Sequence, residues 1–589
     1  MFQKKFKIPT FIKIGSASLL LLLFSIKLSA MAEPKFPKCT FNSNQTPTYA
    51  QMRQSYMQLD SASPYMKLTG IGHSDAGRKI ELFIVNKQQD FVPTQTSGKR
   101  KMVWLIMNGI HPGESEGIDA SILFLQAMAK NPMLIPDGVT ILVIPAYNVD
   151  GMGNRKTFTR ANQNGPVQKG FRASANNYDL NRDFIKADSK TTFSFYKIFH
   201  AWCPQVFLDT HTSNGADYQY TMTLISTQKD KLGGPAADFL YQKMNPFLYR
   251  QMKAKSFEMA PYVNVFGNSP DAAGYEAFVE SAKYSTGFAA LFGTLGFVAE
   301  THMLKPYPNR VQATYALLQC FLQFCAQNSQ ELVRTKAAQV EWMQLQQVYS
   351  SNYVVQKSVN KNLLFNGYEL EKLPSQLGNY ERHSYNRKRA FQRTILYYDS
   401  CYPSFQCRVP KYFVVPQSWQ KTIDRLAANG VEHTVVEDTR NFDGKAKYIQ
   451  EIKYANSPSE GHFVHREVSC VTKPVQIELQ AGDWIVPTHQ MAIRYIMEVL
   501  SPEAWDGFFA WNFFDPILNE KEGFSDYAFE DEALQMLAQN PAFKQKFEDW
   551  KNANPDKIGN KYEVLGFLYH NSPYAEAEYR RFPVFFEEK

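Results

Sequence analysis

The sequence predicts an α/β fold in which a mixed, largely parallel twisted sheet is covered by helices and is followed by a strand-rich region of mixed α/β character. Two strongly apolar runs, 103–107 and 138–146, flank an amphipathic segment with helical spacing at 118–128. A strand, a helix and a strand in this order are typical of a parallel sheet covered by helices. Two further apolar runs, 206–208 and 296–299, extend the pattern.

The segments before these runs predict a helix and a hairpin. Residues 46–60 have a helical pattern, with Thr46 or Thr48 near its start. Residues 66–72 and 79–85 are strand-like and flank an Asp-Ala-Gly turn. We therefore expect a helix and then a β-hairpin ahead of the parallel strands.

The chain beyond the last of these strands predicts first helices and then shorter elements. Helical patterns cover 313–325 and 330–350. The segments 411–415, 419–429 and 433–436 are typical of a strand, a helix and a strand in a βαβ-like unit.

Two later segments complete the strand-rich region. Residues 448–470 and 475–479 alternate as half-buried strands do. The segment 503–515 is dense in aromatic residues, which favours a core or an interdomain contact over a platform for substrate.

A chain of 589 residues is too long for one hydrophobic core, so two to four domains are expected. Hydrophobic residues make up 44% of the chain and charged residues 20%, which is typical of a globular protein. We predict a signal peptide at 1–32, a catalytic domain at 33–335 and a C-terminal accessory region at 336–589.

The first 32 residues have the pattern of an export signal. A lysine-rich start precedes an apolar core at 14–26, and the small-x-small segment 30–32 is a cleavage site. The apolar core is shorter than the ~20 residues of a membrane-spanning helix. An uncleaved anchor is the alternative. We expect an exported protein, periplasmic or secreted, with no stable membrane span after cleavage.

The net charge of the mature chain gives no indication of nucleic-acid binding. The whole chain has 64 Lys and Arg and 56 Asp and Glu, hence +8, and the predicted signal holds five Lys and no acids. Removing it leaves 8 − 5 = +3. Since no Lys/Arg block is present either, we expect no nucleic-acid partner.

The seven cysteines are an odd number, so an exported chain would keep at least one free thiol. Cys401 and Cys407 flank the turn-rich segment YPSFQ, and we expect them to form a local disulfide. Cys320 and Cys325 lie on a helical pattern and are expected to be buried thiols. The absence of Cys-x-x-Cys excludes a zinc ribbon or a redox motif.

Polar side chains follow the predicted strands, where the active residues of open α/β sheets lie. His111 and Glu114 come after the strand at 103–107, and the Pro-Gly between them enforces a turn. Zinc takes imidazole and carboxylate ligands, and a catalytic zinc uses three protein ligands and leaves one position for water. The alternative is an ordinary strand-to-helix turn whose acid favours the positive helix end.

Two other strand ends supply the remaining candidates. His211 follows 206–208 and lies 211 − 114 = 97 residues after Glu114, so it is the candidate third ligand. Glu300 follows 296–299 and is the candidate general base, since such a carboxylate can take a proton from water and give it to a leaving amine. The structural alternatives are a turn histidine and a carboxylate in a surface salt bridge.

Together these segments resemble the zinc carboxypeptidases of the carboxypeptidase A type, the funnelin or M14 group, in the bacterial form with a long C-terminal extension. The resemblance covers about residues 46–325 and departs from the family at Val149, where Asn-Pro-Asp-Gly has proline. The six local matches, in family order, are IGHSDAGRKIELF (71–83), HPGE (111–114), YNVDG (147–151), YDLNRDF (178–184), THTSN (210–214) and VAETH (298–302).

The resemblance implies a zinc carboxypeptidase-like catalytic domain with one Zn²⁺ per chain. His111, Glu114 and His211 would hold the metal. Glu300 would act as general base and then as general acid.

The resemblance also implies how the substrate is held. Asn181 and Arg182 would bind its C-terminal carboxylate, for which the planar fork of an arginine is suited. Asp179 would orient the first histidine ligand.

Two further roles are less closely tied to single residues. Arg160 is the best positional match to the arginine that opposes charge on the tetrahedral intermediate, with Arg155 and Arg172 as rivals. Tyr284 and Tyr275 are rival matches to the tyrosine that folds over the substrate.

The leading interpretation is a zinc-dependent metallocarboxypeptidase that hydrolyses C-terminal residues from peptides by metal-activated water, with Glu300 as general base. The alternatives are a peptidoglycan peptide-trimming hydrolase, an N-acyl amino acid deacylase with the same site, and an inactive binding module. The intact candidate ligands argue against the binding module. The expected partner is a peptide or a peptidoglycan stem.

Overall fold

The computed structural model describes Met1 and residues 36–94, 101–271 and 273–589. Apart from Met1, the predicted signal at 1–32 lies outside the described residues. Within the described ranges, no helix combines the length and the apolar character needed to cross a membrane.

The N-terminal half is built on an eight-stranded mixed sheet with the order β1-β2-β4-β3-β5-β9-β6-β7. Its centre, β4-β3-β5-β9, is parallel. Strands β1 and β2 run antiparallel to their neighbours, and β6 is antiparallel to β9 but parallel to β7. This confirms the predicted mixed, largely parallel sheet and the early hairpin. The strands are β1 (Met66–His73), β2 (Lys79–Asn86), β3 (Met102–Met107), β4 (Val139–Ile144), β5 (Val206–Ser213), β6 (Met222–Ser226), β7 (Met259–Pro261) and β9 (Leu295–His302).

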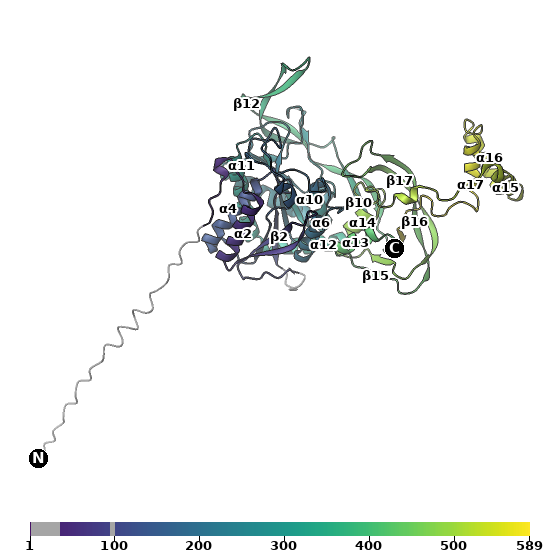
Figure 1. The fold of residues 1–589 in the computed structure, drawn as a ribbon, viewed down its shortest axis with the longest axis horizontal. Helices are drawn as coiled ribbons and strands as arrows, with labels where there is room; N and C mark the ends of the chain where they lie inside the picture. Colours follow the sequence, from purple (N-terminus) through teal and green to yellow (C-terminus); the bar gives the residue numbers. More distant parts are fainter. Residues whose placement is uncertain (2–35, 95–100, 272) are drawn as a thin grey trace.

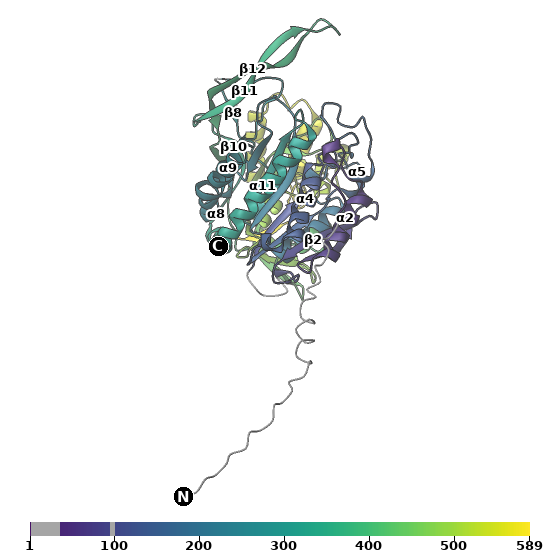
Figure 2. The same ribbon diagram turned by 90° about the vertical axis from the view of Figure 1, so that its left-hand side faces the viewer.

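Helices cover both faces of this sheet. Figure 2 shows α4 and α11 lying over one face, with α2 beside them. The predicted helix at 313–325 is longer, because Pro308 is accommodated in the first turn of α11. The helices are α2 (Tyr49–Ala62), α4 (Glu116–Lys130), α5 (Val149–Gly153), α6 (Lys190–Trp202), α7 (Lys229–Leu232), α8 (Gly234–Phe239), α9 (Asn245–Ala254), α10 (Ser285–Leu291), α11 (Tyr307–Gln327) and α12 (Ser329–Leu345).

The buried strand β3 explains why its sequence is continuously apolar. Successive side chains of a strand point to opposite faces of the sheet. Trp104 packs on one face against Phe124 of α4 and Phe321 of α11. Leu105 belongs to the cluster on the other face, which also contains Phe195 of α6. Both faces of β3 are therefore packed against apolar side chains and exclude water. Polar residues can be accommodated only at the ends of the strand.

The C-terminal half is strand-rich, as predicted. Its largest sheet has the order β15-β18-β14-β19-β16-β17, in which β18 lies between the two strands of the predicted βαβ-like unit. Its elements are β10 (Val348–Val355), β11 (Lys361–Pro374), β12 (Glu381–Tyr398), β13 (Cys401–Arg408), β14 (Tyr412–Val415), α13 (Gln420–Ala428), β15 (Thr434–Val435), β16 (Arg440–Tyr454), β17 (His465–Leu479), β18 (Trp484–Pro487), α14 (Ile493–Leu500), α15 (Asp526–Gln539), α16 (Pro541–Ala553), α17 (Lys561–His570) and β19 (Phe585–Glu587).

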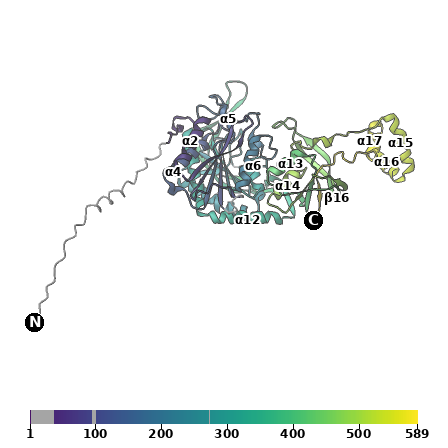
Figure 3. The ribbon, with the colours of Figure 1, turned by 60° about the horizontal axis from the view of Figure 1, so that its bottom comes forward.

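Two parts of this half project from the body. The hairpin β11–β12, which also pairs with β8 (Tyr275–Glu276), extends from the sheet region (Figure 1). Helices α15, α16 and α17 form a small bundle at the far end of the molecule (Figure 3).

The predicted strand at 448–470 is wrong in its bounds. It is divided between β16 and β17 because the turn-forming Asn-Ser-Pro-Ser-Glu-Gly segment reverses the chain.

The two halves share a core. One hydrophobic cluster contains Phe288 of α10 and Tyr495 of α14, whose rings are 6.4 Å apart, together with Phe508 and Trp511. The aromatic segment 503–515 is therefore a packing element, as predicted. Helix α12 runs without interruption across residues 335 and 336, and the domain division there stays a prediction.

The predicted Cys401–Cys407 disulfide is wrong, since both cysteines are free thiols. They lie on the same strand, β13, and six residues of extended chain span about 20 Å at about 3.3 Å per residue. A disulfide needs Cα atoms within about 7 Å. Cys320 and Cys325 are buried thiols on α11, as predicted.

Candidate metal and substrate site

The carboxyl ends of β3, β5 and β9 meet at one edge of the sheet, because these strands are parallel neighbours. In this register Met107 lies beside Asp209, and His211 lies beside Glu300. The polar residues that follow the three apolar runs in the sequence are therefore brought together by strand pairing.

The His-Pro-Gly-Glu segment forms a turn directly after β3. The backbone N–H of Glu114 donates to the carbonyl of His111 at 2.8 Å. Gly113 is required here, because a Cβ atom would lie 2.5 Å from Cδ of Arg160 and 2.9 Å from the carbonyl oxygen of Gly170. The turn thus directs His111 and Glu114 to the same side.

Three side chains present a metal-binding set of donors. His111, Glu114 and His211 are buried, and each offers a ligand atom within 4.8 Å of the others. Nδ1 of His111 lies 3.2 Å from Oε1 of Glu114, and Nδ1 of His211 lies 3.1 Å from Oε2. Two imidazole nitrogens and one carboxylate oxygen are ligands that zinc prefers.

The other nitrogen of each imidazole is held by a carboxylate. Nε2 of His111 lies 2.9 Å from Asp179, and Nε2 of His211 lies 2.9 Å from Asp209. Carboxylates in this position orient metal-ligating histidines and fix their tautomer. Nδ1 of His111 is buried and has no hydrogen-bond partner, so its lone pair is free for a cation. The site fits a zinc ion.

The local charges keep Glu114 ionised. Although burial opposes it, Arg160 and His111 hold the pKa of the Glu114 carboxyl well below its usual range. Burial also opposes protonation of His211, but the carboxylates of Asp209 and Glu114 raise the pKa of that imidazole. An ionised carboxylate between two imidazole nitrogens is a suitable set of donors for a cation.

Glu300 lies next to these donors and is set apart by its environment. Burial is the main cause that raises the pKa of its carboxyl to about 8, and His211 opposes the shift. A carboxyl with a pKa near neutrality can accept a proton in one step and return it in the next.

These groups line a cavity of about 420 Å³. The three predicted metal ligands, Glu300, Asn181 and Arg182 are in its wall, whereas Arg160 and Asp179 are not. The lining residues are His111, Glu114, Arg172, Asn181, Arg182, His211, Thr212, Ser213, Asn214, Ile225, Tyr262, Asn264, Phe266, Phe278, Tyr284, Ser285, Thr286, Val298 and Glu300.

Arg160 lies behind Glu114 instead of in the cavity wall. Its Nη2 is 2.8 Å from Oε1 of Glu114, and its Nε donates to Gln163 at 2.5 Å. Arg172, one of its two rivals from the sequence, lines the cavity and pairs with Asp179 at 2.9 Å. Arg155 bonds the carbonyls of Thr46 and Pro47, away from the cavity.

Asn181, Arg182 and Tyr284 line the cavity together. The guanidinium of Arg182 lies over the Tyr284 ring, 4.6 Å from its centroid. Oδ1 of Asn181 is buried and has no partner. The rival tyrosine, Tyr275, is buried in a separate aromatic cluster and donates its hydroxyl to Pro261.

Residues 52–231 match the family model for zinc carboxypeptidase, Peptidase_M14. The matched segment includes His111, Glu114 and His211. This segment of the chain is similar to zinc carboxypeptidase domains. The match supports a zinc metallopeptidase, which is a hydrolase.

Proteins of similar sequence are also named carboxypeptidases. The chain is 21% identical over 483 residues to carboxypeptidase 2 of Trichophyton rubrum, covering 78% of this chain and 83% of that protein. It is 27% identical over 141 residues to the probable carboxypeptidase 2 of Trichophyton verrucosum, covering 23% and 24%.

Two solved structures are more distant. The metallo-carboxypeptidase of Burkholderia cenocepacia has 16% identity and a TM-score of 0.35, covering 47% of this chain and 68% of that one. The carboxypeptidase A of Helicoverpa armigera has 14% identity and a TM-score of 0.36, covering 55% and 81%.

Two residues of the carboxypeptidase site were not singled out from the sequence. Asp209 is fully buried, bonds His211 and accepts a hydrogen bond from Ser285 at 2.7 Å. The Asp-x-His spacing on a strand was the available signal, because residues two apart lie on the same face. Ser285 had no such signal, since it comes from the start of α10.

Proposed function

We propose that this protein is a zinc-dependent metallocarboxypeptidase that removes the C-terminal residue of peptides, with one zinc ion held by His111, Glu114 and His211. The observation that carries the proposal is the single cavity that is lined by these donors, by Glu300 and by Arg182. A metal centre, a proton carrier and a carboxylate-binding group in one cavity are the parts that this hydrolysis needs.

When bound, zinc supplies a Lewis acid that polarises a carbonyl and makes water a better nucleophile at neutral pH. Nδ1 of both histidines and the Glu114 carboxylate would hold it. Asp179 and Asp209 keep the two imidazoles in the tautomer that leaves Nδ1 unprotonated.

Glu300 carries the proton in this proposal. Its carboxylate takes a proton from the attacking water and gives it to the nitrogen of the leaving amino acid.

The substrate is held by its free carboxylate. Arg182 offers a planar pair of donors, and Asn181 adds a neutral donor beside it. We assign to Arg172, instead of Arg160, the stabilisation of charge on the carbonyl oxygen, because Arg172 lines the cavity. Arg160 then has the task of keeping Glu114 ionised and in place.

We also propose that the chain is exported, with cleavage after residue 32 of the predicted signal, and that residues 33–335 form the catalytic domain. Peptides, including the stem peptides of peptidoglycan, are the proposed substrates. The C-terminal region, 336–589, is accessory.

The test compares two forms of the same peptide, one with a free and one with an amidated C-terminus. The proposal predicts release of the last amino acid from the free form alone, because Arg182 needs a carboxylate. Purified muropeptides serve as the second substrate set, and release from these alone would narrow the substrate to cell-wall peptides. Equal cleavage of the amidated peptide would overturn the exopeptidase proposal.

A further inference from the structure

The C-terminal region contacts the carboxypeptidase site at two segments that line or support the cavity. One segment is the turn Asp179–Arg182, which carries Asn181. The other is the connection 278–286, which carries Tyr284. The residues from the C-terminal region come from 460 to 506, so the contacts join parts of the chain that are far apart in sequence.

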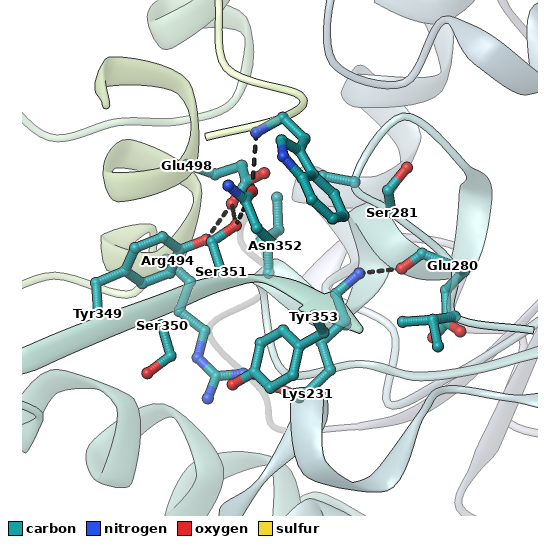
Figure 4. Close-up of a pocket in the computed structure, with 15 residues that line it drawn as sticks. Lys231, Glu280, Ser281, Tyr349, Ser350, Ser351, Asn352, Tyr353, Arg494 and Glu498 are labelled. Atoms are coloured by element: carbon teal, nitrogen blue, oxygen red, sulfur yellow. Dashed lines mark hydrogen bonds between the residues drawn. The ribbon is translucent and has the colours of Figure 1, made fainter. Parts of the chain in front are cut away.

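The connection 278–286 lies between two cavities. Phe278, Tyr284 and Ser285 face the catalytic cavity. Glu280 and Ser281 face a smaller cavity of about 60 Å³, whose opposite wall belongs to the C-terminal region. Figure 4 shows Glu280 and Ser281 on one side of this cavity and Tyr349, Ser351 and Glu498 on the other.

The small cavity leaves this stretch with little packing behind it. Burial raises the pKa of Glu280, and its Oε2 has no hydrogen-bond partner. Oγ of Ser281 is also buried without a partner. A wall with a void and unpartnered polar atoms behind it does not hold a neighbouring side chain rigidly, so the position of Tyr284 has to be fixed by other contacts.

Asp506 supplies such a contact. This aspartate is 1% exposed, and its Oδ2 accepts from the backbone N–H of Lys283 at 2.8 Å. The carbonyl of Lys283 in turn accepts from the N–H of Phe184 at 3.3 Å. Lys283, the residue before Tyr284, is therefore hydrogen-bonded both to Asp506 and to the segment that follows Arg182.

Glu460 makes a matching contact on the other segment. It lies in the turn between β16 and β17, with φ of 52°. Its Oε2 accepts from the backbone N–H of Asp179 at 2.7 Å. Asp179 is the carboxylate that holds His111 and pairs with Arg172. Glu460 therefore helps to fix the backbone of a residue that contacts both of these side chains.

We propose that the C-terminal region is a positioning element for the substrate-binding end of the cavity, acting through Asp506 on Lys283 and through Glu460 on Asp179. This inference rests on the proposed carboxypeptidase function. Asp506 and Glu460 are positioning residues that touch neither metal nor substrate. They hold Tyr284 and Arg182 at the separation that binds a carboxylate, which lowers the ordering cost of binding.

The first test replaces Asp506 and compares it with a matched residue. In Asp506→Ala we expect the KM for a free-carboxylate peptide to rise about tenfold, with kcat changed less, because the carboxylate loses its hydrogen bond from the Lys283 backbone and its ion pair with the Lys283 ammonium group. Asp506→Asn keeps an oxygen acceptor for the Lys283 N–H and restores most of the affinity. Glu503→Ala is the control, since that carboxylate pairs with Lys447 inside the C-terminal region.

Hydrogen exchange gives a readout that does not depend on activity. The amide of Lys283 should exchange at least about tenfold faster in Asp506→Ala than in the wild type or Glu503→Ala, as expected for loss of a native hydrogen bond. If the wild type cleaves no peptide, the proposed function fails while this measurement still tests the contact. Unchanged exchange and unchanged KM in Asp506→Ala would overturn the inference.

Glu460→Ala keeps the test decisive should the buried Asp506 variant not fold, because Glu460 lies in a surface turn and is only half-buried. We expect faster exchange at the Asp179 amide and a higher KM. Its control is Glu467→Ala on the same hairpin, where the carboxylate pairs with Lys453 in solvent. Equal behaviour of these two variants would also overturn the inference.

Discussion

The sheet region and the C-terminal region differ in where they keep their charges. At the edge of the sheet the ionisable residues His111, Glu114 and His211 are buried together. In the hairpin β16–β17, Lys453 and Glu467 form an ion pair whose side chains are 72% and 68% exposed. Burying charges costs several kcal/mol unless they are paired or bind a metal, whereas exposed pairs contribute little. The comparison supports the proposal that one region holds the reaction site and that the other supports it.

The largest effect on activity is expected at Glu300. We expect Glu300→Gln to lower kcat by about 10² to 10⁴, the range for losing a general acid–base group. Zinc content should stay at the wild-type level, because Glu300 is not among the three metal donors. Steady-state kinetics and elemental analysis of the same preparation check both statements. A near-wild-type rate would remove Glu300 from the mechanism.

The next effect separates two arginines. Arg172→Ala should lower kcat by about 10² to 10³, the cost of losing a donor to the developing oxyanion. Arg160→Ala should instead weaken zinc binding, because Arg160 pairs with Glu114 from outside the cavity. Titration with zinc and kinetics at saturating zinc distinguish the two roles. If Arg160→Ala lost kcat with unchanged zinc affinity, the assignment would be reversed.

A smaller effect is expected for the carboxylate clamp. Arg182→Lys keeps the charge but loses the planar pair of donors, so kcat/KM should fall about 10- to 100-fold, the cost of one or two charged hydrogen bonds. The already slow reaction with an amidated peptide should change little. An equal loss on both peptides would argue that Arg182 supports the fold instead of binding the carboxylate.

The smallest effect on activity should come from the helical bundle α15–α17. Phe547 packs on Trp550 and Phe567 in the small core of this bundle. Phe547→Ala should destabilise the bundle by about 3 to 5 kcal/mol and leave peptide hydrolysis unchanged. The matched variant, Phe321→Ala, removes a ring stacked on Trp104 in the core of the sheet region and should lower the Tm for loss of activity. Thermal unfolding followed by residual activity compares them.

The sequence was most informative where structure is local. The His-Pro-Gly-Glu turn follows from its own residues, and the parallel strands bring Glu300 beside His211 without any further information. The choice between Arg160 and Arg172 could not be made, because residues 154–179 form turns and loops with no periodic pattern.

Contacts across long separations were not predictable. The hydrogen bond from Lys283 to Asp506 joins residues 223 apart, and neither one lies in a recognisable motif. The Cys401–Cys407 prediction failed for a related reason: a turn-rich composition was taken as a turn, but the pairing of β10 with β13 holds the segment extended. Tertiary pairing overrode local propensity there.

The central claim is a zinc ion at His111, Glu114 and His211 that is required for hydrolysis of a free C-terminus. Elemental analysis of the purified wild type and of His211→Ala tests it most directly. We predict one zinc per wild-type chain, about a tenth of that or less in the variant as expected from loss of a ligand, and hydrolysis that a chelator abolishes and added zinc restores. Full zinc content in His211→Ala, or chelator-resistant hydrolysis, would contradict the claim.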